Sequence, residues 1–316
     1  MILVYSLKIF ILLIFMLLSV AYLTLLERKL LAYIQKRRGP NVVGYFGLLQ
    51  PFADGLKLLV KETIIPIVSD KILFIISPIL SFSLSLFLFT VIPFSYQYVL
   101  NDIEYGILFI FSISLLNVYN IIIAGWASNS RYAFLGAVRA VAQMISYEVS
   151  MSLVILPIIV FVNSLNLTKI VLFQMNSIWF CFILFGNFIM FLINMLAETN
   201  RLPFDLVEAE SELVAGYNVE YSAVGFALFF IAEYMNIIFM AMFCVILFLG
   251  GWNFYNFNSI IIFIIKVLCL LGFFILVRAV YPRYRYDQLM LLGWKVLLPF
   301  SFLFFIFIVV LIYFWF

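Results

Sequence analysis

The chain alternates long apolar runs with short polar connections. Each run carries at most two charged residues, and each is close to the ~20 residues that a helix needs to cross the hydrocarbon of a bilayer. Backbone groups in lipid must be satisfied within their own segment, so helices are expected rather than strands. The pattern predicts an all-α integral membrane protein with about eight transmembrane helices in one polytopic domain, residues 1–316. The expected spans are about 3–26, 72–94, 105–126, 137–162, 173–197, 222–250, 260–279 and 296–315.

Residues 44–62, in the first long connection, follow an amphipathic pattern instead. Phe52, Leu56 and Leu59 fall on one side of a helix drawn through this segment, and Lys57 falls on the opposite side. An amphipathic helix of this kind lies in the membrane interface or packs against neighbouring spans. Simple anchoring and a more specific role both remain open on the pattern alone.

The basic residues are distributed unequally between the two ends of the expected spans. Of the 18 Lys and Arg residues, 15 lie in or beside the odd-numbered connections. Only Lys8 and Lys169 lie on the opposite side, and Lys266 falls within the seventh span. The positive-inside rule therefore predicts that the odd-numbered connections face the cytoplasm or matrix and that both termini face the other side. The 15 residues are Arg28, Lys29, Lys36, Arg37, Arg38, Lys57, Lys61, Lys71, Arg131, Arg139, Arg201, Arg278, Arg283, Arg285 and Lys295.

Composition supports a membrane location and narrows the chemistry. Hydrophobic residues make up 67% of the chain and charged residues 10%, whereas about a quarter of a soluble domain is charged. The net charge of +3 is too small to indicate a nucleic-acid partner. The chain has no histidine and only three cysteines, without a C-x-x-C pair, so the usual ligands of haem and iron–sulfur clusters are missing. Any redox centre is therefore expected in a partner.

The fifth connection, residues 197–222, is strongly acidic. Asp205 suits a helix N-cap with Glu208 three residues later, and Glu208 and Glu212 would then share a face on which like charges repel. Carboxylates held together resist full ionisation, which favours proton relay, whereas a solvated acidic loop is the alternative. The six carboxylates are Glu198, Asp205, Glu208, Glu210, Glu212 and Glu220.

Two further carboxylates, Glu148 and Glu233, lie inside expected spans. A charge at the middle of a membrane costs on the order of 3 kcal/mol or more, so such a residue usually faces an interior polar path and has a function. Lys266 is the obvious counter-charge among the spans. Glu148, Glu233 and the acidic connection together predict a series of proton-carrying sites that leads into the membrane.

Basic and aromatic residues form another group on the same side of the membrane. Glu27-Arg28-Lys29 ends the first span, KRRGPN follows at 36–41, and YPRYRYD occupies 281–287. Arginines interleaved with tyrosines can bind a planar polar head group by hydrogen bonds and stacking. They are equally typical of a surface that docks lipid or protein, and the residues alone leave both interpretations open.

Five long segments of the chain resemble subunit 1 of respiratory complex I, the proton-pumping NADH:ubiquinone oxidoreductase. They occur in the same order and cover about residues 21–299. The segments read ERKLLAYIQKRRGPNVVGYFGLLQPFADGLKLLVKE, GWASNSRYAFLGAVRAVAQMISYEVS, LAETNRLPFDLVEAESELVAGYNVEYS, FALFFIAEYMNII and YPRYRYDQLM. The resemblance implies a subunit at the junction of the membrane arm and the hydrophilic arm, where it helps to enclose a quinone chamber.

The resemblance also implies two sets of functional residues. Carried over residue by residue, the quinone chamber and the access path for the isoprenoid tail involve Arg28, Arg37, Phe52, Phe230 and Arg278. The acidic path between quinone chemistry and proton pumping involves Glu148, Glu198, Asp205, Glu208, Glu210, Glu212, Glu220 and Glu233. No residue of this chain is expected to be catalytic by itself or to bind a metal.

Substrate, partners and location follow from the same resemblance. It implies ubiquinone as substrate, NADH oxidation with flavin and iron–sulfur clusters in partner subunits, and contacts with other complex I subunits and membrane lipids. The expected location is the mitochondrial inner membrane, with both termini in the intermembrane space and the odd-numbered loops in the matrix; a bacterial plasma membrane is the alternative. Rival functions are a membrane subunit of a hydrogenase-type complex and an ion transporter without redox partners. The RRGPN and EAESELVAGYNVEYS segments favour the quinone enzyme, and the lack of an internal repeat argues against a transporter.

Overall fold

The structure, a computed structural model, describes residues 2–96, 98–205, 216–254 and 257–315. Seven of the described helices are long and apolar enough to cross a membrane. The candidate spans are α1 (Ile2–Ile34), α3 (Lys71–Leu88), α4 (Gly106–Ala127), α5 (Arg131–Val162), α10 (Ala223–Phe248), α11 (Ile260–Val280), and the continuous helix of α12 (Tyr286–Leu291), the π-helical turn η3 (Leu292–Leu297) and α13 (Leu298–Trp315). With a further, shorter apolar helix, they confirm the predicted all-α membrane architecture.

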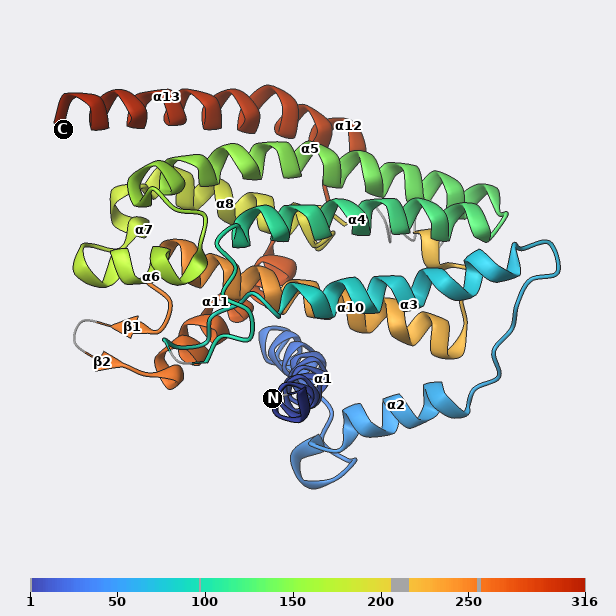
Figure 1. Cartoon of the computed structure of the whole chain (residues 1–316). Helices are drawn as coiled ribbons and strands as arrows, with labels where there is room; N and C mark the ends of the chain where they lie inside the picture. Colours follow the sequence, from blue (N-terminus) through green and yellow to red (C-terminus); the bar gives the residue numbers. More distant parts are fainter. Residues whose placement is uncertain (1, 97, 206–215, 255–256, 316) are drawn as a thin grey trace.

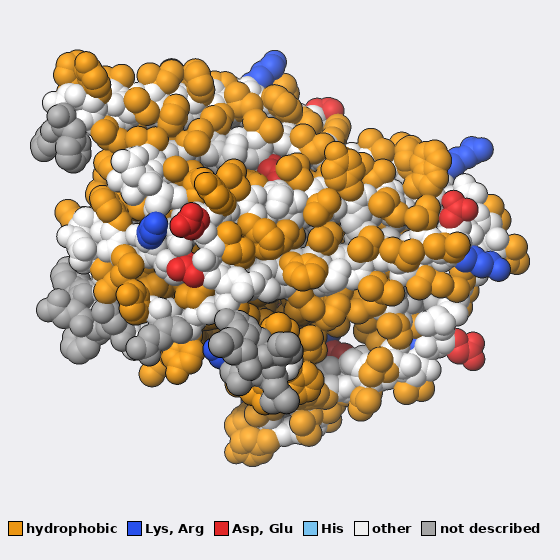
Figure 2. Space-filling view, viewed as in Figure 1, with side chains coloured by type: hydrophobic (Ala, Val, Ile, Leu, Met, Phe, Trp, Pro, Cys, Tyr) orange, Lys and Arg blue, Asp and Glu red, His pale blue; other side chains and the backbone are white. Residues whose placement is uncertain are grey.

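Helix α10 lies at the centre of the bundle. The helices α3, α4, α5 and α13 form a row in which each packs against the next, and α10 packs against α3, α11 and α1 (Figure 1). Met235, Phe239 and Phe243 of α10 are buried almost completely, whereas Phe15 of α1 and Phe307 of α13 are exposed. Hydrophobic side chains cover most of the face seen in Figure 2, as expected for a surface that meets lipid.

The fifth expected span, 173–197, is divided rather than continuous. Its pieces are α6 (Leu167–Asn176), α7 (Phe180–Ile183) and α8 (Phe185–Glu198). The backbone leaves the helical conformation at Ser177 and again at Leu184. The Gln174 side chain donates hydrogen bonds to two backbone carbonyls in the last turn of α10, both at 3.0 Å, and so holds α6 against α10 instead of in line with α8. The apolar run therefore marks the position of this span but not the breaks within it.

Other helices extend beyond the apolar runs that predict them. Helix α5 begins at Arg131 rather than near residue 137, because the Ser130 side chain accepts a hydrogen bond from the backbone N–H of Ala133 and caps the helix there. Helix α1 likewise continues to Ile34, well past residue 26. Hydropathy marks the part of a helix that suits lipid, and these helices continue with polar residues at one end.

The expected amphipathic helix is confirmed as α2 (Gln50–Val60), which follows the short helix η1 (Tyr45–Gly47). Helix α2 packs against α1 and α10 and is joined to α3 by a long connection (Figure 1). Its apolar residues Phe52, Leu56 and Leu59 remain exposed in this chain, Phe52 by 44%. This apolar side of α2 is therefore open to lipid or to another molecule.

Lys266 of α11 does not act as counter-charge to Glu148 or Glu233 among the described residues. Its ammonium group lies 4.4 Å from the centre of the Trp179 ring. It donates hydrogen bonds to three backbone carbonyls, those of Leu249 at 2.6 Å, Gly251 at 3.1 Å and Asn253 at 2.5 Å. These carbonyls connect α10 to a small hairpin formed by β1 (Asn253–Phe254) and β2 (Phe257–Asn258). Lys266 thus closes the C-terminal end of α10, where the helix dipole also favours a cation.

Candidate functional site: two polar networks around α10

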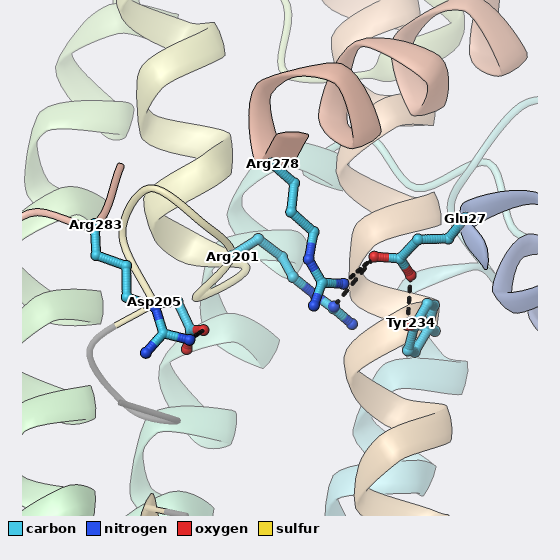
Figure 3. A network of polar contacts seen from close by, with 6 residues as sticks. All are labelled: Glu27, Arg201, Asp205, Tyr234, Arg278 and Arg283. Carbon is cyan, nitrogen blue, oxygen red and sulfur yellow. Dashed lines mark hydrogen bonds and ion pairs between the residues drawn. The ribbon is translucent and has the colours of Figure 1, made fainter. Parts of the chain in front are cut away.

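Four side chains form a charged cluster on one side of α10: Glu27, Arg201, Tyr234 and Arg278 (Figure 3). Arg278 Nη1 donates a short hydrogen bond to Glu27 Oε1, and Arg201 Nη1 lies 3.8 Å from the same oxygen. The Tyr234 hydroxyl donates to Glu27 Oε2 at 2.6 Å. The Arg201 guanidinium lies over the Tyr234 ring, 4.4 Å from its centre. One carboxylate therefore accepts hydrogen bonds from Tyr234 and Arg278 and pairs with Arg201, and it has little room to reorient.

Each member of the charged cluster comes from a different part of the chain. Glu27 belongs to α1, Tyr234 to α10, Arg278 to the last turn of α11, and Arg201 to the segment after α8. The Glu27 side chain is 10% exposed and that of Arg201 is 15% exposed, so the charges are largely removed from water. Such charges require partners because an unpaired buried charge is strongly destabilising. Two guanidinium groups converge on one carboxylate here, an arrangement that suits an anionic or electron-rich guest.

A second ion pair lies beside the charged cluster. Arg283 Nη2 is 3.5 Å from Asp205 Oδ2, and Figure 3 shows the pair next to Arg201. The backbone N–H of Tyr284 donates to Pro203 O at 3.1 Å, and the Tyr284 ring stacks on Phe204 at 5.6 Å. These contacts fasten the segment after α8 to the connection between α11 and α12. The acidic connection and the basic-aromatic segment, which are far apart in the sequence, therefore meet in space.

The residues expected to line a quinone chamber fall into two places. Arg278 belongs to the charged cluster, and the Phe230 ring lies 4.7 Å from that of Tyr234. The other three lie around the end of α1 and along α2. Arg28 Nη1 donates to Asp54 Oδ2 of α2 at 2.6 Å, Arg37 Nε donates to Gln35 at 2.8 Å, and Phe52 makes an edge-on contact with Tyr22 at 6.4 Å. Arg28 and Arg37 therefore do not contact the charged cluster.

An apolar groove leads away from the charged cluster. It lies between α1, α10 and α11 and has a volume of about 370 Å³. Leu23 and Leu271 line both this groove and a small cavity, about 20 Å³, at the charged cluster. The groove is lined by Phe15, Met16, Ser19, Tyr22, Leu23, Leu26, Phe94, Ile238, Met242, Ile260, Phe263, Ile264, Val267, Leu268 and Leu271. A charged head and an apolar chain would therefore find matching surroundings next to one another.

Two small cavities lie on another side of α10, and carboxylates line them or lie beside them; we call them the acidic cavities. Each has a volume of about 30 Å³, and Glu198 lines both of them together with Asn117 and Asn236. Ser114, which lines the first cavity, donates a short hydrogen bond to Glu148. Glu233 lines the second cavity. Glu198 therefore lies between Glu233, in the second cavity, and Glu148, which reaches the first cavity through Ser114.

The polar atoms around the acidic cavities are only partly satisfied. In the second cavity the Tyr217 hydroxyl donates to Glu233 Oε1 at 2.9 Å. Within the described part of the chain, Glu148 Oε2, Glu198 Oε2 and Asn236 Oδ1 are buried and have no hydrogen-bond partner. Buried polar atoms without protein partners are commonly satisfied by water, and each cavity exceeds the roughly 10–15 Å³ that one water needs. The acidic cavities therefore fit bound water between carboxylates.

None of the remaining acidic residues of the expected proton path lines an acidic cavity among the residues that the structure describes. Asp205 pairs with Arg283 and not with another carboxylate among its described contacts. Glu220 is half-buried in the turn before α10 and lines neither acidic cavity. Glu208, Glu210 and Glu212, together with the helix expected after Asp205, lie outside the described residues.

Sequence reasoning does not single out Glu27 or Tyr234 as site residues. Glu27 stands beside Arg28 and Lys29 at the end of an apolar run, so the pattern groups it with the connection. Helix α1 continues to Ile34, which places Glu27 inside the helix and among three other segments. The argument that draws attention to Glu148 and Glu233, a carboxylate within a helix that suits lipid, would also find Glu27 if the expected helix were extended.

Comparisons with known proteins agree on one family. The family model described as NADH dehydrogenase matches residues 7–309. NADH-ubiquinone oxidoreductase chain 1 of Chondrus crispus is 58% identical over 293 residues, which is 90% of either chain. The protein of the same name from Arabidopsis thaliana is 56% identical over 90% of either chain. A bacterial relative, an NADH-quinone oxidoreductase subunit of Rhodospirillum rubrum, is 55% identical over 89% of this chain and 86% of its own.

Proposed function

The chain belongs to the NADH dehydrogenase family as a membrane subunit of complex I, and from this premise we propose that it forms much of the ubiquinone chamber and couples quinone reduction to proton translocation. The observation that carries the proposal is the arrangement around α10. The charged cluster, with its two arginines, lies on one side of the helix, and the acidic cavities, with unsatisfied carboxylate oxygens, lie on another.

The charged cluster supplies the electrostatic part of the quinone step. Reduction of a quinone builds negative charge on its ring oxygens, and fixed positive groups in a site with little water stabilise such charge strongly. Arg201 and Arg278 are fixed positive groups of this kind, because Glu27 and Tyr234 hold them in place. The electrons come from an iron–sulfur cluster in a partner subunit, and flavin and NADH bind elsewhere in the complex.

The ends of α1 and α2 supply the access path to the chamber. Arg28 and Arg37 extend the positive region beyond the charged cluster, while Phe52 and Phe230 offer aromatic surface to the isoprenoid tail. Phe52 lies on the exposed apolar side of α2, which suits a path that begins in lipid. In this proposal the Arg28–Asp54 pair fixes α2 against α1 beside that path.

The acidic cavities supply the proton path. Glu198 and Glu233 line cavities that fit water, and Glu148 lies beside the first cavity on Ser114, so protons can pass between carboxylates and water without a large movement of helices. Asp205, Glu220 and the acidic residues 208, 210 and 212 extend the path toward the quinone chamber. The proposed location is the mitochondrial inner membrane, with the basic odd-numbered loops in the matrix and both termini in the intermembrane space.

A substitution at Glu198 tests the coupling role most directly, because Glu198 lines both acidic cavities. Glutamine keeps the volume and part of the hydrogen bonding but cannot take up a proton. We expect Glu198→Gln to lower NADH:quinone turnover and proton uptake together by about 100-fold or more, the lower end of a typical general acid–base contribution. Both rates are measured side by side in reconstituted vesicles containing the assembled complex.

Two measurements accompany this test. Oxidation of NADH by a hydrophilic artificial acceptor, which bypasses the quinone, is expected to stay at its original rate and shows that the NADH-oxidising part of the complex is intact. Asn187→Ala is the matched control: Asn187 is also a buried polar residue of α8, but it donates to Val154 O and lines neither acidic cavity. A Glu198→Gln complex that reduces quinone and takes up protons at the original rates would remove the acidic cavities from the proton path.

A further inference from the structure

Two short segments each contribute neighbouring residues to both polar networks. On α10, Glu233 lines the second acidic cavity and the next residue, Tyr234, belongs to the charged cluster. After α8, Glu198 lines both acidic cavities and Arg201, three residues later, belongs to the charged cluster. The two networks are therefore separated by no more than one helical turn in each segment.

The first of these connections follows from helix geometry. Consecutive residues of an α-helix point in directions about 100° apart, so Glu233 and Tyr234 face different neighbours while sharing one rigid turn. Helix α10 is the most completely buried of the candidate spans and is held by α1, α3 and α11. A force on the Tyr234 side chain therefore acts on the backbone that carries Glu233.

The second connection is a closed turn. The backbone N–H groups of Thr199, Asn200 and Arg201 donate to the carbonyls of α8 at 3.2, 3.2 and 3.3 Å. The Gln143 side chain of α5 also donates to Ala197 O and to Phe204 O, each at 2.9 Å. Glu198 and Arg201 are thereby fixed in one compact unit.

We propose that Tyr234 is a positioning residue that fixes the Glu27 carboxylate in the charged cluster and, through the turn that it shares with Glu233, makes the second acidic cavity respond to charge in the cluster. This inference rests on the proposed function. A negatively charged quinone near Arg201 and Arg278 competes with Glu27 for the same guanidinium donors. Glu27 then keeps its hydrogen bond from the neutral Tyr234 hydroxyl, and the strength of that hydrogen bond changes because the guanidinium groups are shared with the quinone.

The titratable and charged groups that face Tyr234 come from every element around the charged cluster. They are Glu27 of α1, Arg201 of the segment after α8 and Arg278 of α11, with Glu233 adjacent on α10 itself. The Tyr234 hydroxyl donates to Glu27, and its ring supports the Arg201 guanidinium. Phenylalanine at this position keeps the ring and removes only the hydroxyl, so Tyr234→Phe isolates the hydrogen bond to Glu27.

A double-mutant cycle in the assembled complex tests the inference. We expect Tyr234→Phe alone to lower NADH:quinone turnover by about 10-fold, the effect of losing one hydrogen bond to a charged group, with unchanged NADH oxidation by a hydrophilic acceptor. We expect Glu233→Gln alone to lower both turnover and proton uptake. Residues that act as one unit are not additive, so the double variant should be no slower than the slower single variant.

Tyr221→Phe is the matched control because it also removes a buried phenol hydroxyl. That hydroxyl bonds to Ser77 and to Ala124 O, at 2.9 and 3.2 Å, rather than to a carboxylate. The turnover losses of Tyr221→Phe and Glu233→Gln should therefore multiply. If Tyr234→Phe does not assemble, the pair Arg201→Lys and Glu198→Gln tests the coupling of the two networks through the second connection, and the same non-multiplying result is expected.

The remaining outcomes distinguish failure of this inference from failure of the proposed function. Single losses that multiply in the Tyr234→Phe/Glu233→Gln variant overturn the inference and leave the proposed function intact. A Tyr234→Phe complex with the original turnover overturns it as well. If Glu233→Gln alone leaves turnover and proton uptake unchanged, the proposed proton path itself fails.

Discussion

Charged side chains are held among the apolar helices in two places in this molecule, and the groups that satisfy those charges differ between the two places. At one end Glu27, Arg201 and Arg278 satisfy each other side chain to side chain, next to a small cavity and an apolar groove. At the other end Lys266 is satisfied by backbone carbonyls and by the face of Trp179. Both arrangements meet the cost of placing charge in a membrane protein, but only the first contains partners that can be exchanged.

The difference indicates which buried charges are available for function. Backbone carbonyls cannot leave Lys266 without unfolding the end of α10, so that site holds the structure together. Side-chain partners can be displaced by a guest of similar charge, so the Glu27 end can bind, release and respond. A charge within a span is therefore informative only together with the identity of its partners.

The largest effect is expected at Glu27. Glu27→Ala removes the carboxylate that Arg201 and Arg278 share. Removing one partner of a buried ion pair costs about 3–5 kcal/mol, so the assembled complex should lose stability. Quinone reduction should fall at least ~100-fold, because the arginines are no longer held in place. The measurement is quinone reduction relative to NADH oxidation by a hydrophilic acceptor.

A charge-keeping variant sharpens this prediction. Glu27→Asp retains the carboxylate but shortens its reach, so we expect activity between that of the original complex and that of Glu27→Ala. Equal activity of Glu27→Ala and the original complex would contradict the role of the charged cluster, and the comparison of the two ends would lose its basis.

A smaller effect is expected at Arg28, whose ion pair with Asp54 is largely open to solvent, with the Arg28 side chain 50% exposed. An exposed ion pair contributes at most about 1 kcal/mol, so Arg28→Ala should assemble normally. Quinone reduction should nevertheless fall about 10-fold, because a positive charge near the access path is lost.

Asp54→Asn is the matched control for Arg28. It breaks the same ion pair but keeps the arginine charge, and it should leave quinone reduction within about twofold of the original rate. If Asp54→Asn and Arg28→Ala slow the reaction equally, the contact between α1 and α2 matters and the charge of Arg28 does not.

The sequence was sufficient to predict most of the architecture, because a helix that spans a membrane must be apolar along its length and therefore appears in the sequence as a long apolar run. Helices α4, α10 and α11 begin and end within two residues of the expected spans, whereas α3 ends at Leu88 rather than near residue 94 and α2 occupies only Gln50–Val60 of the expected 44–62. The break at Leu184 was not predicted, since nothing in an apolar run shows where a chain leaves the helix. The contact that fixes α6 comes from Gln174, and its partners are 72 and 73 residues away.

The site was less predictable because it depends on distant pairs. Glu148 and Glu233 were recognised from their apolar surroundings, which is a local property. Glu27 is 251 residues from Arg278 in the sequence, and only the fold brings the two together. Lys266 shows a different error. Because Lys266 and two glutamates all lie within spans, the sequence suggests a carboxylate partner for the lysine. Its actual partners are backbone carbonyls that lie much nearer in the sequence.

The smallest effect on turnover is expected at Lys266, and it tests the other half of the comparison. Lys266→Gln keeps an N–H donor for the carbonyls around residue 251, whereas Lys266→Met leaves them without any donor. Both variants should reduce quinone and take up protons within about twofold of the original rates, because neither removes a group of the charged cluster or the acidic cavities. The half-life of the assembled complex at elevated temperature should fall, more for Met than for Gln, since unsatisfied buried carbonyls cost about 1–3 kcal/mol each. Loss of proton uptake in a Lys266→Gln complex of normal half-life would contradict this, and it would return Lys266 to the proton path as the counter-charge that its position in the sequence first suggested.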